Sequence, residues 1–326
     1  MRRRQLLALL GATAAVYSTE ASQRAQAQEY PSRTITLVAA IAPGGAVDTV
    51  ARILAEKLQP LLRQSVVVEN RTGAGGMIGT ASVARAPADG YTLLLMEPSA
   101  VLAKWLHKSA SFDVIGDFTP IALVATSPLV LFAHPSLPAE DVRGLIAYSR
   151  ANPGKLAVGT PGIGSPHHMA VLLLNAAAGI DIPQVSYRGS APALSDLLAG
   201  QIPLIWSTPT AVMPFVEQAK VKALGVSSEK RVAILPRVPT IEENALPGFH
   251  IEAWLGVAAP AGMPAEAVLR LEAAVRDITK LPEVEQRMSP LGFSLDYLPA
   301  QKFRDLIASE HQRYGEVIRA AGIMPN

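Results

Sequence analysis

Two turns rich in glycine and proline, about 120 residues apart, each lead from an apolar strand into a helix. Residues 35–40 run into Pro43-Gly44-Gly45, after which a helix is expected over residues 46–62. Residues 156–158 run into the turn 159–165, after which a helix is expected from about residue 166. The first turn of a helix leaves N–H groups unpaired and carries partial positive charge, so it suits a carboxylate or a phosphate. The repeat therefore indicates two walls that close on one small anion.

The residue types in the first turn favour ligand contact but leave Asp48 open. Gly44 and Gly45 let the backbone approach a ligand without a Cβ in the way. Asp48 falls near the third helical position, where a carboxylate interacts well with the helix dipole. It either caps the helix or contacts the ligand through a water or an amino group.

The second turn offers the N–H groups of Gly162 and Gly164 and the hydroxyl of Ser165. The pair His167-His168 does not predict a metal site, because adjacent helical residues point about 100° apart and the remaining histidines are scattered. We expect His168 to donate a hydrogen bond to a carboxylate near the mouth of the site, which would add mild pH dependence.

Alternating strands and helices must position these turns, which is the signature of α/β layers with parallel strands. Two apolar runs, 121–133 and 251–258, look like crossings between domains; the first is too long for an average strand and is interrupted by Pro128. We therefore expect one domain over residues 28–125 plus 251–326 and a second over 126–250. Ser99 and Thr126 are expected at strand ends facing the cleft, and a third helix start follows Tyr187 and Gly189.

Composition excludes several classes of protein. Residues 1–27 read as a secretory signal, with three arginines, an apolar stretch and an Ala-Gln-Ala site before residue 28; the Sec and twin-arginine routes both remain open. Their removal leaves 25 basic and 26 acidic residues, a charge of −1, with no basic stripe for nucleic acid. The absence of cysteine rules out disulfides and thiol chemistry.

Segments along the whole mature chain resemble the tripartite tricarboxylate transporter substrate-receptor family, also called Bug proteins. They include Ala42-Pro-Gly-Gly-Ala-Val-Asp48, Val68-Glu-Asn-Arg-Thr-Gly-Ala-Gly-Gly76, Asp89-Gly-Tyr-Thr-Leu93, Pro161-Gly-Ile-Gly-Ser-Pro-His-His168 and Ala320-Ala-Gly-Ile-Met-Pro325. The resemblance implies a periplasmic binding protein of the two-domain Venus-flytrap kind, with type II topology and two crossover strands as the hinge. It also implies a small carboxylate ligand and a two-component membrane permease as partner. We expect a monomer without a cofactor.

Two positions depart from the family pattern. An aspartate or asparagine pair is common in the family near Ser207-Thr208, and small polar residues are usual where Glu97-Pro98 stands. If Ser207 lines the pocket, the missing negative group favours a ligand without a cationic amine, whereas an inward Glu97 argues the other way. The candidate ligand-binding residues are Pro43, Gly44, Gly45, Ala46, Asp48, Ser99, Thr126, Gly162, Gly164, Ser165, His168, Tyr187, Gly189 and Ser207.

Two other functions are weighed against a transport receptor. An enzyme is disfavoured, because Gly-x-Ser-x-Gly is absent and the glycines at 73–79 miss the dinucleotide-binding register at Ile78. A ligand sensor that reports to a signalling partner needs the same fold, so the residues alone leave that alternative open.

Overall fold

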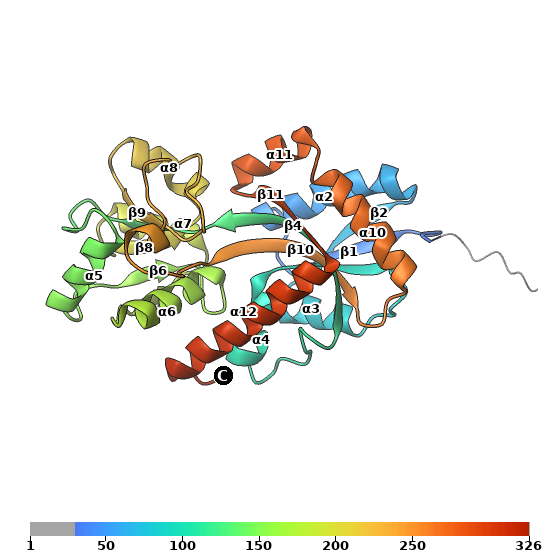
Figure 1. Ribbon diagram of the computed structural model, residues 1–326, viewed down its shortest axis with the longest axis horizontal. Coiled ribbons are helices and arrows are strands. Elements are labelled where there is room, and N and C mark those ends of the chain that lie inside the picture. Colours follow the sequence, from blue (N-terminus) through green and yellow to red (C-terminus); the bar gives the residue numbers. More distant parts are fainter. Residues whose placement is uncertain (1–29, 326) are drawn as a thin grey trace, which may run out of the picture.

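The computed structural model describes residues 30–325, which fold into two β-sheets arranged end to end with helices on their faces (Figure 1). The predicted export signal lies outside the described residues. We call the parts built on the two sheets lobe A and lobe B. Lobe A contains six strands in the order β11-β4-β10-β3-β1-β2, and lobe B contains five in the order β7-β6-β8-β5-β9.

The strands of lobe A are β1 (Ile35–Ala39), β2 (Val66–Asn70), β3 (Thr92–Met96), β4 (Phe118–Pro128), β10 (Glu252–Pro260) and β11 (Ser294–Pro299). Those of lobe B are β5 (Val130–Ala133), β6 (Val158–Thr160), β7 (Gln184–Ser186), β8 (Leu204–Ser207) and β9 (Lys222–Val226). Each sheet contains three neighbouring parallel strands, β2-β1-β3 in lobe A and β7-β6-β8 in lobe B. The next strand in the sheet is antiparallel and enters from the other lobe: it is β10 in lobe A and β5 in lobe B. This repeated order is the predicted type II topology, although the sheets are mixed rather than purely parallel.

Two chain crossings connect the lobes. Strand β4 belongs to lobe A and continues through Leu129 into β5 of lobe B, so the long apolar run breaks next to Pro128, as its composition indicates. The chain returns through β10, which pairs antiparallel with β4 over its whole length. Figure 1 shows these strands running between the two halves of the molecule. The domain boundaries at residues 125/126 and 250/251 stay a prediction.

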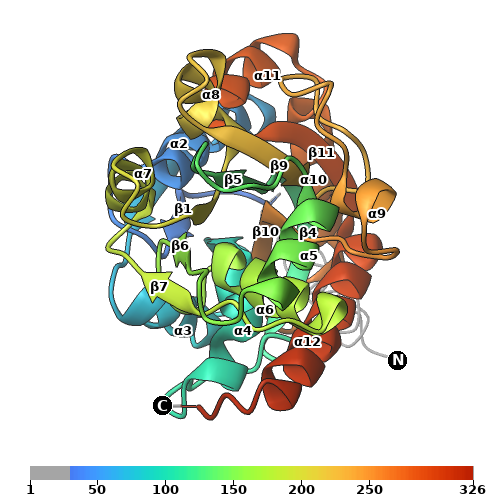
Figure 2. The same cartoon turned by 90° about the vertical axis from the view of Figure 1, so that its left-hand side faces the viewer.

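Helices cover both faces of each sheet. In lobe A, α2 (Ala46–Leu62), α10 (Ala265–Ile278) and α11 (Pro282–Met288) share a core on one face, and α3 (Met77–Ala84), α4 (Pro98–Leu106) and α12 (Ala300–Ala320) pack on the other. In lobe B, α7 (Ser190–Leu198) and α8 (Pro209–Glu217) lie on one side of the sheet. The other side carries α5 (Val142–Ala151), α6 (Pro166–Ala178) and the short α9 (Ile241–Asn244), as Figure 2 shows from that end of the molecule. Two 3-10 turns, η1 (Ala74–Gly76) and η2 (Ser289–Leu291), complete the described elements.

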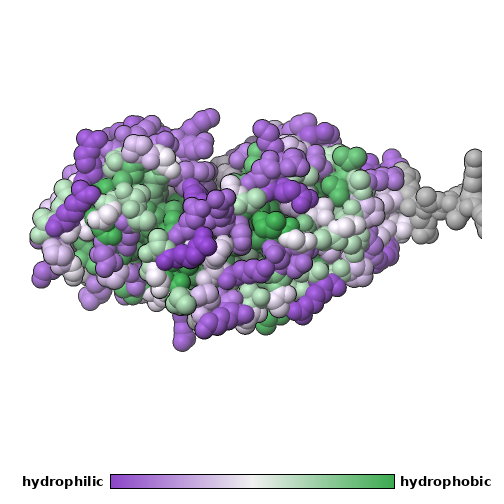
Figure 3. Space-filling view, turned by 60° about the horizontal axis from the view of Figure 1, so that its bottom comes forward, coloured by the Kyte–Doolittle hydropathy of each residue, from purple (hydrophilic) through white to green (hydrophobic). Residues whose placement is uncertain are grey.

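One apolar core runs from lobe A into lobe B. It joins Phe303 and Tyr314 on α12 to Met169 on α6 and Trp206 on β8, because α12 packs against α4 and also touches α6. Over the face seen in Figure 3, apolar side chains are scattered among hydrophilic ones. No helix within residues 30–325 is long and apolar enough to span a bilayer.

Candidate functional site

Five helices begin at the wall of one cavity between the lobes. This space of about 290 Å³, called the helix-start cavity, is bordered by Ala46 of α2, Pro98 of α4, Pro166 of α6, Ser190 of α7 and Thr208, the N-cap of α8. Each start carries about half a positive charge, so their convergence creates a positive potential without a basic side chain. The cavity is therefore suited to an anion.

A second space of about 270 Å³, called the side cavity, adjoins the first and shares Glu97 and Pro166 with it. Its walls include Ser99 at the start of α4, and Gly164 and Ser165 before α6. Among the described residues bordering either cavity there is no lysine or arginine. Recognition of an anion here depends on backbone N–H groups and neutral side chains.

Two buried polar side chains border the helix-start cavity without a partner. Ser127, on the crossing strand β4, is fully buried, and its Oγ makes no hydrogen bond. His167, in the first turn of α6, has both ring nitrogens shielded from solvent and unpaired. Burial lowers the pKa of His167 to about 4, so its ring is neutral near pH 7 and can donate one hydrogen bond. Since buried polar groups are normally paired, both side chains point to a polar ligand or ordered water in the cavity.

The loop before α2 is held from inside by Asp48. Its buried carboxylate accepts hydrogen bonds from the Gly44 N–H (2.9 Å), the Asn70 amide (2.8 Å) and the Arg52 guanidinium (3.0 Å). These donors outweigh the opposing effect of burial and hold the pKa of Asp48 below its ordinary value. Of the predicted residues in this loop, Ala46 borders the cavity, whereas Pro43, Gly44 and Gly45 are exposed at its edge. The geometry supports a positioning role for Asp48.

The loop before α6 is organised in a comparable way. Ser165 is the N-cap: its Oγ accepts the His168 N–H (3.2 Å) and donates to the Gly162 carbonyl (2.7 Å). The buried His168 accepts the Gly164 N–H at Nδ1 (3.3 Å), so this ring fixes the loop while His167 borders the cavity. The sequence analysis named His168, not His167, as the candidate ligand-binding histidine. Residues 159 and 160 also lie in β6, which runs over Val158–Thr160, rather than in the turn.

The third predicted helix start contributes through Ser190. The Tyr187 hydroxyl, expected to face the ligand, instead donates to Asp196 (2.7 Å). Gly189 has φ 109° and is the N-cap of α7, which lets the chain turn into the cavity wall. Arg188 is exposed.

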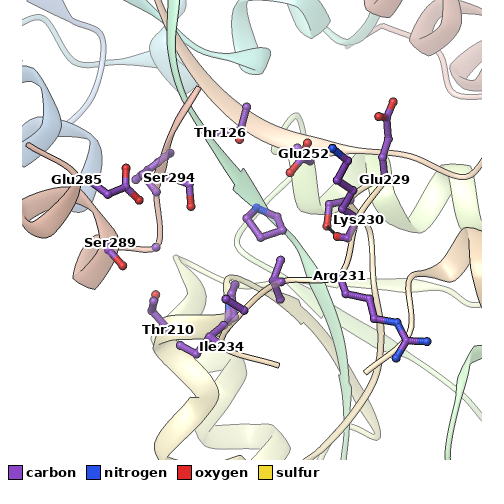
Figure 4. A pocket seen from close by; sticks show the side chains of 17 residues that line it. Thr126, Thr210, Glu229, Lys230, Arg231, Ile234, Glu252, Glu285, Ser289 and Ser294 are labelled. Atoms are coloured by element: carbon purple, nitrogen blue, oxygen red, sulfur yellow. Dashed lines mark hydrogen bonds between the residues drawn. The ribbon is translucent and has the colours of Figure 1, made fainter. Parts of the chain in front are cut away.

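The largest of the three cavities, about 530 Å³, lies beside the crossing strands and is called the hinge cavity (Figure 4). Thr126 and Glu252 border it from the crossing strands, and Glu285, Ser289 and Ser294 border it from lobe A. Thr126 thus faces this cavity and is absent from the lining of the other two. Among the described residues that line the hinge cavity, one α-helix start is present, at Pro209, so the smaller pair of cavities is the better candidate for an anion site.

Sequence reasoning placed two further residues differently. Ser99 lies inside the first turn of α4, a helix that was not predicted, and borders the side cavity. Ser207 is the last residue of β8 and is buried; the next residue, Thr208, borders the cavity. A hydroxyl residue followed by proline is a helix-start signal, and this signal could have identified Thr208.

The lobes touch on both sides of these cavities. A Cβ at Gly164 would lie 3.5 Å from Leu106 of α4, and one at Gly292 would lie 2.8 Å from the hydroxyl of Thr210 on α8. The two small cavities therefore lie between parts of both lobes that approach each other closely. Within the described residues, no group of His, Cys, Asp and Glu is placed to hold a metal ion.

Comparison with known proteins identifies relatives of this fold and sequence. The family model described as "Tripartite tricarboxylate transporter family receptor" matches residues 50–323. A protein from Pseudomonas sp. (strain P51), named for the tcbD-tcbE intergenic region, is 39% identical over 97% of this chain and 94% of its own length.

Three solved structures share the whole architecture. The periplasmic binding protein BugD superposes with a TM-score of 0.74 at 34% identity, covering 91% of this chain and 100% of its own. R. palustris Rpa4515 with adipate has a TM-score of 0.77 at 33% identity, with coverage of 91% and 100%. MatC from Rhodopseudomonas palustris, with bound malate, has a TM-score of 0.72 at 33% identity, with coverage of 89% and 100%.

Proposed function

Since the chain belongs to the tripartite tricarboxylate transporter receptor family of periplasmic solute-binding proteins, we propose that it binds one small carboxylate between its lobes and delivers it to a two-component membrane permease. The proposal includes removal of residues 1–27 during export and the division of the chain into residues 28–125 plus 251–326 and residues 126–250.

The convergence of five helix starts on a cavity without basic side chains carries this proposal. Neutral N–H donors match the single charge and two acceptor atoms of a carboxylate, whereas phosphate sites commonly add lysine or arginine to balance the higher charge. A space of about 290 Å³ lies at the lower end of the range for small-molecule sites, which favours a compact ligand. Adipate and malate in two relatives are of this size and class.

The two-lobed construction couples binding to closure. A carboxylate that contacts Ala46 and Pro98 of lobe A together with Pro166 and Thr208 of lobe B makes its full set of contacts only when the lobes meet. Charge-assisted hydrogen bonds contribute about 1.5–3 kcal/mol each, which must exceed the cost of ordering and desolvating the ligand. The permease then recognises the closed form.

The test is a screen of the mature chain against mono-, di- and tricarboxylates by thermal shift, followed by calorimetric titration. A cognate acid should bind with one site, and at about 100 times its Kd it should stabilise the chain by about 2.7 kcal/mol. Ala46→Phe places a ring in the cavity and should abolish binding. Ala265→Phe is the matched control, because Ala265 is likewise the exposed first residue of a helix but lies outside the three cavities. Equal binding of sulfate or phosphate, or unchanged affinity in Ala46→Phe, would contradict the proposal.

A further inference from the structure

Glu97 occupies the boundary between the helix-start cavity and the side cavity. It is the last residue before α4 and belongs to the lining of both spaces. It is also the sole carboxylate among the described residues bordering these two cavities. Any ligand that extends from one space into the other passes this carboxylate.

No lysine or arginine among the described residues balances Glu97 inside the site. The basic side chains in the lining are two histidines: His167, which is neutral near pH 7, and His107, which borders the side cavity. The polar contact recorded for the carboxyl is with Ser99, and burial raises its pKa above the ordinary value. A partly buried carboxyl with no lysine or arginine among the described residues of the site is stabilised when the ligand brings the positive charge.

The remaining walls of the helix-start cavity are largely apolar. They include Val47, Trp254, Leu255 and Phe293. Such walls suit a short hydrocarbon spacer. An anionic group at the helix starts and a cationic group at Glu97 would then balance every charge in the site.

We propose that Glu97 makes this receptor selective for carboxylates that also carry a protonated amine, over dicarboxylates with the same spacer. This inference rests on the proposed function, since it assigns the carboxylate end of the ligand to the helix starts. The missing negative group at Ser207 favoured a ligand without an amine, whereas an inward Glu97 favoured one with an amine. We follow Glu97, because it borders the cavities and Ser207 does not.

The experiment uses matched ligand pairs in which an ammonium group replaces one carboxylate. The pairs are β-alanine and succinate, 4-aminobutyrate and glutarate, 5-aminopentanoate and adipate, and 6-aminohexanoate and pimelate. Calorimetric titration of the mature wild-type chain at pH 7 should show at least about tenfold tighter binding of the amine member in the best-fitting pair. Glu97→Gln, which keeps the size of the side chain, should weaken the amine member at least about tenfold and remove the preference.

Glu229→Gln is the control variant, because Glu229 is an exposed carboxylate that borders only the hinge cavity. It should keep the wild-type preference, and melting curves without ligand verify that both variants fold. Tighter binding of dicarboxylates by the wild-type chain overturns the inference by itself, even if Glu97→Gln does not fold. That result leaves the proposed function standing and indicates a protonated Glu97 that donates to a second carboxylate. Binding of no member of the panel overturns the inference, whereas the proposed function is overturned only if the wider screen of mono-, di- and tricarboxylates also finds no ligand.

Discussion

Gly45→Val is the substitution that best separates ligand binding from folding. Gly45 is the N-cap of α2 with φ −82° and ψ 174°, a conformation open to any residue, and a Cβ built there meets nothing within 4 Å. Loss of glycine at an N-cap costs about 1 kcal/mol, while the reduced freedom of the unfolded chain contributes about 0.4–1 kcal/mol in the opposite direction. We therefore expect the free energy of unfolding to change by less than about 1 kcal/mol.

Binding should respond far more strongly. The added side chain enters the open edge of the cleft in front of α2, where the ligand approaches Ala46. Loss of a single charge-assisted hydrogen bond of about 1.5–3 kcal/mol weakens binding about ten- to one-hundred-fold. Urea unfolding measures the stability and calorimetric titration with the best acid of the screen measures the affinity.

Two other glycines complete the comparison. Gly116→Val is the matched control, because Gly116 is exposed, its nearest neighbour atom would be 3.8 Å away, and it lies outside the three cavities. It should change neither stability nor affinity. Gly44 has φ +89°, so Gly44→Ala should destabilise the chain by about 1–2 kcal/mol. An unchanged affinity in Gly45→Val would remove this loop from the site, and an unfolded variant would refute the geometric argument.

Three further outcomes are expected. Asp48→Ala should lower the free energy of unfolding by about 1–3 kcal/mol, because the donors bonded to this carboxylate lose their acceptor. The stabilisation by Asp48 is present above its ordinary pKa and is lost as the pH falls through its lowered pKa. The free energies of unfolding of variant and wild type, measured with urea, should therefore converge in acid. His167 has a folded-state pKa of about 4 against an ordinary 6.5, so this ring alone should cost the chain about 3 kcal/mol of stability as the pH falls from 6.5 to 4. Burial also lowers the pKa of His168 to about 4, and its comparable loss remains in His167→Gln, so the variant should show a flatter but still sloping pH profile of stability. Gly256→Ala should cost about 1–3 kcal/mol, since its Cβ would overlap the Phe303 ring, while the Kd for ligand, measured by calorimetry, stays unchanged.

Local signals in the sequence determined the parts of the fold that were predicted well. Helix α2 has the expected bounds at both ends, because a glycine turn precedes an amphipathic run that ends before the left-handed Arg63. The long apolar run was correctly divided at Pro128, since proline cannot continue the hydrogen-bonded ladder. The predicted family and fold class are confirmed by the matched family model and the solved relatives.

The misplaced residues depend on tertiary packing that no local pattern encodes. Helix α4 was missed because Glu97-Pro98-Ser99 follows a strand directly, and its burial against α12 is long-range. His168 was chosen from the sequence, whereas a rotation of about 100° around α6 turns the His168 ring to the loop and leaves His167 bordering the cavity. Thr126 was expected in the cleft. Because successive side chains of a strand point to opposite faces, Thr126 borders the hinge cavity and its neighbour Ser127 borders the helix-start cavity.

The five converging helix starts also bear on how such a receptor can diverge. N–H groups belong to the backbone, so no substitution other than one to proline deletes them, and the proposed affinity for an acid would be inherited with the fold itself. Mutations at wall positions such as Glu97, Ser127 or Thr208 can then change which acid fits without first abolishing binding. Under this arrangement, ligand choice can drift through neutral steps across a family whose members share about a third of their residues.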